Sequence, residues 1–438
     1  MRLPRIHADT AALHESRELR SLVLGNVISG MGTQASLVAL PYQVYVQTKS
    51  PLLTGLLGAA ELGPLIVMAL LGGALADRLD RRRLLLLDQV ALVLVAAALC
   101  ATAVAGEPPV WLLYVLAGLL AGFGAIQNVA RSAIVPNLVA PENLRSALAI
   151  NHGLYQLTMV VGPGLGGLLI SAGGVQVAYA VDALSCAAMV IGVLRIGPQP
   201  PLRVEHEPEV GMRRSIADGL RFVGRNRALL GSFAIDLNAM AFGMPRALFA
   251  VLSVSVYHAG ASGTGLLFAA VSAGATVAAL TTRWLEHVRR LGLIVIAAVT
   301  VWGLAVAAAA VVANLWFAAA MLAIAGAADS ISAVCRNVIN QTVTPDAMRG
   351  RMSSIYSLVV TSGPRIGDIE AGTVASLTTA RISMATGGLA CLAGVALIVI
   401  LFPQLAAFDL KRVDAQLAES VPEPSHSAYA GPATRRAS

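Results

Sequence analysis

The feature that most constrains this chain is a succession of long apolar runs separated by short polar breaks. A run of about 20 apolar-rich residues is long enough to cross the hydrocarbon core of a bilayer as a helix. Twelve such runs can be marked, at about 21–46, 52–76, 84–105, 110–131, 146–171, 174–194, 228–257, 263–282, 291–311, 314–336, 350–378 and 383–402. The pattern predicts an all-α polytopic membrane protein with twelve transmembrane helices.

The composition agrees with this prediction. The chain is 57% hydrophobic and only 13% charged, whereas a soluble chain carries about a quarter charged residues. Twelve spans use about 240 apolar-rich residues, so little of the chain is left for a soluble domain. The net charge of +7 is therefore not read as a sign of nucleic-acid binding, and membrane lipids are the expected surroundings.

The distribution of positive charge predicts the orientation. All but four of the 31 Lys and Arg residues fall in the tails, in alternate connections or at the helix ends beside them. Lys49 and Arg381 lie in the opposite connections, and Arg246 and Arg365 lie inside runs. Because Lys and Arg accumulate in cytoplasmic loops, both termini are predicted to be cytoplasmic.

Other features exclude whole classes of protein. Neither lysine, at 49 or 411, follows a glycine, so the chain has no phosphate-binding P-loop, and it has no H-E-x-x-H zinc motif. The four scattered cysteines are interpreted as core residues. We expect no cofactor, no metal and no enzymatic activity. The polar segment 1–20 does not resemble a cleaved signal peptide, and the preference for arginine over lysine, with abundant alanine, is typical of a GC-rich bacterial genome.

The polar stretch 195–227 divides the runs into two sets of six, at 21–194 and 228–404. Its first part is rich in Pro and Glu and reads as a linker. Its second part, 213–227, spaces apolar residues at helical intervals among arginines, which predicts a helix lying on the membrane surface. Residues 1–20 are predicted to be a cytoplasmic tail, and 405–438 a disordered one.

The two sets of runs repeat each other. Residues 131–134, 141–145 and 162–167 recur as 336–339, 345–349 and 363–368. The shared landmarks are an arginine, then Pro-acid-x-x-Arg, then Gly-Pro. Two six-helix halves that form a midplane site between them are the architecture of many secondary transporters.

The break between the second and third runs carries a motif. The pattern G-x-x-x-D-R-x-x-R-R is formed by Gly73, Asp77, Arg78, Arg81 and Arg82. It resembles the signature loop between helices 2 and 3 of the major facilitator superfamily of secondary transporters, except that residue 80 is Asp where that family usually has glycine. The resemblance implies a conformational-switch loop, in which Asp77 pairs with an arginine or caps the next helix.

A second motif lies in the fifth run. Gly162, Pro163, Gly166 and Gly167 resemble the antiporter motif of exporters in the superfamily, and Gly363 and Pro364 are their counterparts in the second half. Proline removes a helix hydrogen bond and glycine permits close helix approach, so a hinge is favoured and plain packing is the alternative. The family's upstream glycine is Thr158 here. The arginine of the exporter proton relay is absent from 114–124.

Across the chain the best resemblance is to the enterobactin-exporter-like branch, through residues 73–87, 163–178, 215–223 and 348–356. It implies a proton-coupled antiporter that exports a siderophore, drug or similar amphipathic small molecule by alternating access, and we expect the chain to act as a monomer. Proton-coupled uptake of a small metabolite is one alternative, and a membrane scaffold or receptor without transport is another.

Ionisable side chains inside spans are costly and are functional candidates by default. The chain offers more acids than bases at such positions: Glu61, Asp182, Asp236, Asp329, Asp368 and Glu370, against Arg246 and Arg365, with Arg336 at the predicted cytoplasmic mouth. A carboxylate without a cationic partner favours its protonated form in a low-dielectric setting. This surplus predicts proton coupling.

Three assignments follow from the spacing. Arg365 and Asp368 are expected to pair at i,i+3, and Arg336 to meet Asp329 two helical turns away in a gate. Glu370 is then left alone and is predicted to carry the coupling proton. Glu61 and Asp236 are held in reserve for that role, and a structural salt bridge is the alternative for each group.

Overall fold

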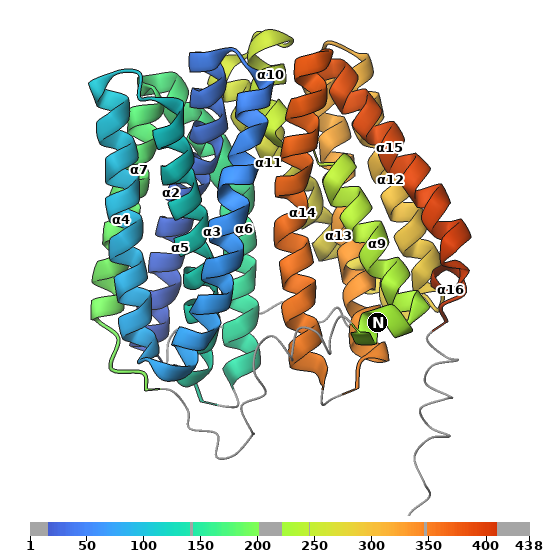
Figure 1. Ribbon diagram of the computed structural model, residues 1–438. Helices are drawn as coiled ribbons and strands as arrows, with labels where there is room; N and C mark the ends of the chain where they lie inside the picture. Colours follow the sequence, from blue (N-terminus) through green and yellow to red (C-terminus); the bar gives the residue numbers. More distant parts are fainter. Residues whose placement is uncertain (1–15, 141–142, 201–220, 245, 346–347, 410–438) are drawn as a thin grey trace, which may run out of the picture.

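The computed structural model describes residues 16–140, 143–200, 221–244, 246–345 and 348–409, and every regular element in these ranges is a helix (Figure 1). The first half contains α2 (Arg17–Thr48), α3 (Pro51–Arg78), α4 (Arg81–Ala105), α5 (Val110–Ile134), α6 (Leu144–Gly173) and α7 (Val175–Leu194). The second half contains α9 (Arg227–Phe242), α10 (Arg246–Ser255), α11 (Gly260–Thr281), α12 (Leu291–Val311), α13 (Leu315–Val343), α14 (Arg349–Leu377), α15 (Ala380–Leu401) and the short α16 (Pro403–Ala406).

Eleven segments of the described chain are long and apolar enough to cross a membrane, with α9 and α10 counted as one. The twelfth predicted span corresponds to α14, which has 29 residues and lies alongside α3. This helix is long enough to cross a membrane but not apolar enough, because Arg365, Asp368 and Glu370 lie within it. The all-α polytopic prediction is therefore confirmed, and its least apolar helix is the one with most intramembrane charge.

Local chemistry explains where several helices begin. Helix N-termini leave backbone N–H groups without partners, which short polar side chains can satisfy. At six helix starts such a side chain accepts a hydrogen bond from the backbone N–H of the third helical residue: Ser16, Ser50, Asp80, Asn226, Asn314 and Thr379. Gly106 (φ 127°) and Gly174 (φ 82°) end α4 and α6 in conformations that favour glycine.

The helices form two bundles that meet along a restricted seam. In the first bundle α2 packs on α6 and α7, and α4 packs on α5 and α7; in the second, α12 packs on α13 and α15, and α9 on α14 and α15. The bundles contact each other chiefly through α3 with α14 and α6 with α11. We call the end with the connections 49–50, 106–109 and 312–314 the upper end, as in Figure 1, and the opposite end the arginine end.

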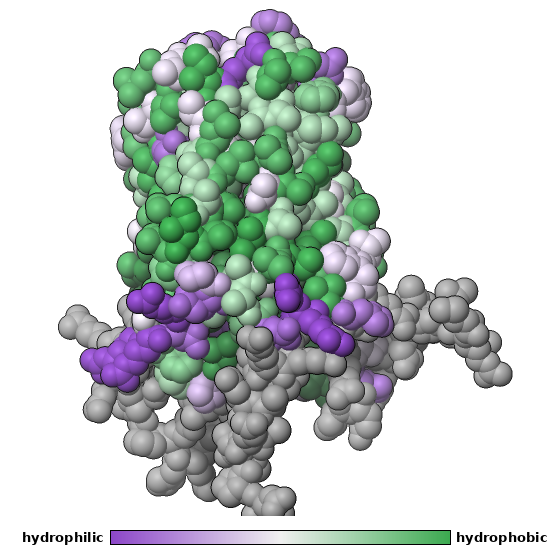
Figure 2. All heavy atoms as spheres, turned by 90° about the vertical axis from the view of Figure 1, so that its right-hand side faces the viewer, coloured by the Kyte–Doolittle hydropathy of each residue, from purple (hydrophilic) through white to green (hydrophobic). Residues whose placement is uncertain are grey.

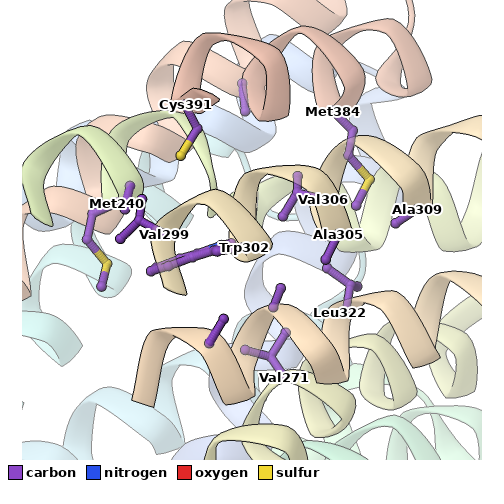
Figure 3. Close-up of a cluster of buried hydrophobic side chains, with 14 of the residues drawn as sticks. Met240, Val271, Val299, Trp302, Ala305, Val306, Ala309, Leu322, Met384 and Cys391 are labelled. Carbon is purple, nitrogen blue, oxygen red and sulfur yellow. The ribbon is translucent and has the colours of Figure 1, made fainter. Parts of the chain in front are cut away.

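The surface and the core fit a bilayer. Figure 2 shows a continuous hydrophobic band around the middle of one face, with hydrophilic residues gathered towards the arginine end. The core of the second bundle centres on Trp302, which is 1% exposed and surrounded by Val271, Val299, Val306 and Leu322 (Figure 3). The side chains thus leave apolar surface on the outside as well as inside, as a lipid solvent permits.

The connecting segments are described only in part. Most of the predicted surface helix at 213–227 lies outside the described residues, although 221–225 is helical. The predicted tail begins at 405, but Leu405 and Phe408 are buried against the second bundle. The packed chain therefore extends at least to this point. The domain boundaries otherwise stay predictions.

Candidate functional site: charged clusters at and beside the seam

Two glycine crossings bring the bundles together near the upper end. A Cβ atom at Gly55 of α3 would lie 2.9 Å from the Cα of Gly372 in α14. A Cβ atom at Gly167 of α6 would lie 2.9 Å from the Cα of Gly265 in α11. Both distances are shorter than real Cβ contacts, so only glycine permits these crossings. In the upper part of the seam, the backbones of α3 and α14, and those of α6 and α11, are therefore in direct contact.

The Gly-Pro motifs also pack closely within each bundle. A Cβ atom at Gly166 would lie 2.7 Å from the Cα of Ala35, and one at Gly363 would lie 2.7 Å from the Cβ of Met240. Helices α6 and α14 run through Pro163 and Pro364 without interruption. The packing interpretation of the motifs is therefore observed, whereas the hinge interpretation stays a prediction.

An ion pair bridges the two bundles beside the α3–α14 crossing. The Nε of Arg365 in α14 donates to Oε2 of Glu61 in α3 at 3.2 Å, and both side chains are only 15% exposed. Arg365 also donates to the carbonyl of Thr361 at 3.0 Å. Because Glu61 and Arg365 belong to different bundles, this contact must break if α3 and α14 separate.

A second pair lies one turn along α14. Arg246, the first residue of α10, lies 3.7 Å from Asp368, and the backbone N–H of Ala247 donates to the same carboxylate at 2.8 Å. A carboxylate at a helix N-terminus is stabilised by the unpaired N–H groups and the helix dipole. Asp368 therefore holds the start of α10 by charge and by hydrogen bond.

This arrangement corrects the predicted pairing of Arg365 with Asp368. The two side chains take separate partners, Glu61 and Arg246. Side chains at i and i+3 of a helix point in directions that differ by about 60° around the helix axis, so they can face different neighbours. Here one faces α3 and the other faces α10, whose proximity to α14 the sequence did not reveal.

The break in the seventh span creates this second pair. The predicted run 228–257 is interrupted after Phe242, and α10 starts at Arg246. The indole N–H of Trp302 donates to the carbonyl of Gly243 at 2.8 Å, which satisfies a backbone group left free by the break. Interrupted helices mark binding sites in many transporters. The sequence Gly243-Met244-Pro245 was the available signal.

A second charged cluster is buried within the second bundle. Arg336 of α13 contacts Asp236 of α9 at 2.7 Å and Asp329 at 3.7 Å, and donates to Ser332 at 2.6 Å. Arg336 and Asp236 are each 1% exposed. The predicted contact between Arg336 and Asp329 is present. Asp236, the reserve candidate for the coupling proton, is part of the same cluster.

Three further acids have no cationic partner among the described residues. Asp182 of α7 accepts hydrogen bonds from Ser36 at 2.6 Å and Thr33 at 3.2 Å. Glu370 is half-buried on α14 and takes part in none of the ion pairs described above. Asp88 of α4 is 3% exposed, and neither of its oxygens accepts a hydrogen bond. Sequence reasoning missed Asp88, although its position inside the predicted run 84–105 could have marked it.

The loop between α3 and α4 is anchored to the end of α7. Asp80 caps α4 by accepting from the N–H of Arg83 at 3.0 Å, and it also accepts from the N–H of Gln199 at 2.9 Å. Arg82 donates to the carbonyls of Val193 and Leu194 at the end of α7. The capping role considered for Asp77 is therefore filled by Asp80.

The structure gives less information on the other residues of the loop motif. The side chains of Asp77 and Arg78 lie outside the described residues, so their predicted pairing stays a prediction. Arg81 has an interaction of its own, and a Cβ at Gly73 would meet no atom within 4 Å.

Two bundles related by a sequence repeat, a glycine seam and intramembrane ion pairs are the expected parts of a transporter, and comparison with known proteins agrees. The model of a family described as "Transmembrane secretion effector" matches residues 10–429. This chain belongs to that family, within the major facilitator superfamily. It is thus a multi-pass membrane transporter, as the first motif implied.

Several curated relatives share most of the chain's length. The enterobactin exporter of Salmonella typhi is 32% identical over 373 residues, which cover 84% of this chain and 88% of the relative. The enterobactin exporter of Citrobacter koseri is 30% identical over 392 residues, covering 89% and 92%. The enterobactin exporter of Shigella boydii is 31% identical over 403 residues, covering 89% and 95%.

Solved structures share the fold at low sequence identity. A bacterial homologue of the human lysosomal transporter Spinster, in an inward-facing and unoccupied conformation, has a TM-score of 0.66 at 15% identity and covers 91% of this chain and 97% of its own. A peptide transporter of the POT family in complex with sulfate has a TM-score of 0.70 at 13% identity, with coverages of 90% and 96%. These neighbours show the fold alone.

Proposed function

We propose that this transporter is a proton-coupled exporter of a siderophore or a similar amphipathic small molecule, and that it works by alternating access. The substrate class rests on the relatives, which are enterobactin exporters along most of their length. Their direction of transport favours export over the uptake alternative. Membership of a transporter family disfavours a scaffold or receptor without transport.

The observation that carries the mechanism is the ion pair between Glu61 and Arg365. It joins the bundles beside the crossing of α3 and α14, where Gly55 and Gly372 bring the two backbones into direct contact. Such a contact is stable while the upper end is closed and is lost when the bundles part. Since the strongest inter-bundle contacts lie on α3–α14 and α6–α11, rocking about this seam is the motion that we propose.

The coupling proton is assigned to Glu370, as the sequence predicted. Glu61, Asp236, Asp329 and Asp368 each contact an arginine, whereas Glu370, like Asp88 and Asp182, contacts none that the structure describes. Of these three acids, only Glu370 lies on α14, a helix of the seam between the bundles. An intramembrane carboxylate without a cation exchanges its charge for a proton at lower cost than a paired one. Protons from outside would load it, and the cytoplasm would strip it.

The remaining partners follow from the same proposal. We propose that the chain works as a monomer in the bacterial cytoplasmic membrane with both termini in the cytoplasm. Reporter fusions test the orientation: Gly106 and Gly260 should read as external and Glu207 as cytoplasmic. An external signal at Glu207 would contradict the twelve-span topology.

The function is tested with purified protein in proteoliposomes. We expect iron-free enterobactin to cross the membrane when a pH gradient is imposed, and its movement to stop when the gradient is collapsed with an ionophore. Movement that is indifferent to the gradient would contradict proton coupling. Absence of movement for enterobactin and for a panel of amphipathic dyes would contradict the substrate class.

The assignment of Glu370 is tested by Glu370→Gln, which mimics the protonated form. We expect loss of gradient-driven export with retention of substrate binding and of substrate exchange. Glu107→Gln, an exposed glutamate in the α4–α5 connection, is the matched control and should transport normally. Normal driven export by Glu370→Gln would transfer the role to another carboxylate, with Asp88 the next to test.

A further inference from the structure

A groove lies between α2 and α7 at the arginine end of the first bundle. It has a volume of about 910 Å³, and its walls are formed only by residues of these two helices and the residue that follows α7. Its floor contains Gly25 and Gly192, which are buried. The groove lies apart from the main seam, because that seam is formed by α3 with α14 and α6 with α11, none of which lines the groove. No part of the proposed transport route uses it.

The groove has a charged end and an apolar wall. Arg17, Arg20 and Arg195 line its end, all three exposed and none in an ion pair among the described residues. The apolar wall is formed by Leu24 and Ile191, which are 57% and 54% exposed.

One acid also lines the charged end. Glu18 accepts a hydrogen bond from the backbone N–H of Gly197 at 3.0 Å, so this carboxylate is already held by the protein. Three arginines against this one acid leave the end of the groove cationic.

The dimensions match a lipid. From Arg17 to Ile28 the helix rises roughly 16 Å at 1.5 Å per residue, so the groove reaches from the helix end well into the apolar band. Guanidinium groups bind phosphate oxygens in a forked geometry, and basic pockets between helices at a membrane surface bind anionic headgroups. The apolar wall continues from the charged end in the direction that an acyl chain would take.

We propose that this groove binds an anionic phospholipid, with its phosphate at Arg17, Arg20 and Arg195 and an acyl chain along Leu24, Ile28 and Ile191. A free inorganic anion would use the arginines but would leave the exposed apolar wall without a role. The continuity of the two surfaces therefore favours a lipid. The proposal does not depend on the substrate or on the coupling ion.

The test uses the full-length protein in detergent, titrated with phosphatidylglycerol or phosphatidylcholine and followed by native mass spectrometry. We expect tighter binding of phosphatidylglycerol. Arg20→Gln/Arg195→Gln should weaken it about 25-fold, since each arginine near an anionic surface contributes roughly a fivefold change. Arg289→Gln/Arg290→Gln, an equal loss of charge from exposed arginines at the start of α12, should leave it unchanged.

A second variant separates the lipid from other occupants. Ile191→Trp fills the groove without altering charge and should also reduce phosphatidylglycerol binding, with an unchanged melting temperature. The proposal is overturned if the two double variants lose binding equally. It is also overturned if inorganic phosphate displaces the lipid while Ile191→Trp has no effect, or if the wild-type protein does not prefer phosphatidylglycerol over phosphatidylcholine.

Discussion

The glycine seam allows a sharp test of alternating access through Gly167→Ala. The added Cβ would lie 2.7 Å from the carbonyl oxygen of Ala261 and 2.9 Å from the Cα of Gly265. Both are backbone atoms of the other bundle, so no side-chain rotation can relieve the clash. In the conformation closed at the upper end, the backbones of α6 and α11 must therefore either become strained or move apart.

The expected size follows from the cost of overpacking, about 1–3 kcal/mol. A cost confined to one of two conformations changes their ratio by roughly 5- to 150-fold. Alanine also favours helix over glycine by about 0.5–1 kcal/mol, but this gain applies to α6 in both conformations and does not alter the ratio.

The measurement is the distance between spin labels on the exposed residues Glu107 and Ala313, which lie in upper-end connections of opposite bundles. The four native cysteines are replaced by alanine in the background. In Gly167→Ala we expect the longer distances to become the main population. Turnover in proteoliposomes should fall, because the cycle needs both conformations.

Gly164→Ala supplies the control within the same helix. Its added Cβ would meet only the Cβ of Ala269, at an ordinary 3.8 Å, so its distance distribution should match the wild type. An unchanged distribution in Gly167→Ala would refute the reasoning. Equal shifts in both variants would show that helix propensity, and not the seam, controls the equilibrium.

Three further predictions follow from the charged groups. Arg336→Met should destabilise the protein by about 3–5 kcal/mol, because the buried carboxylate of Asp236 and the partly buried one of Asp329 lose their cation. Thermal unfolding in detergent would measure this change, and an unchanged melting temperature would contradict the described cluster. Glu61→Arg places two cations together across the seam and should impair transport, whereas Glu61→Arg/Arg365→Glu should restore part of the rate. A reversed pair that transports no faster than the single variant would contradict the proposed role of the ion pair between Glu61 and Arg365. Asp77→Asn should insert normally but slow transport, because the loop's charge pairing favours one conformation, and a normal initial rate at normal expression would reduce the motif to a topological signal.

The sequence by itself determined the architecture. Apolar runs of spanning length, alternate arginine-rich connections and a repeated set of landmarks depend only on transfer free energies and on helix length. They predicted the helices and the two halves, whereas the family was indicated by the resemblance of the motif at Gly73 to Arg82. Intramembrane charge also marked Glu61, Asp236, Asp329 and Arg336 as residues worth attention, since an ionisable group in a span is costly wherever it faces.

The tertiary structure alone decided which of these groups meet. Sequence spacing on α14 favoured the pairing of Arg365 with Asp368, but the packing of α3 and α10 against that helix gave each a different partner. Asp236 joined Arg336 from another helix, one hundred residues away along the chain. Such pairings depend on the rotation of each helix about its axis and on the break before Arg246. Both are set by contacts between distant segments, which local periodicity does not contain.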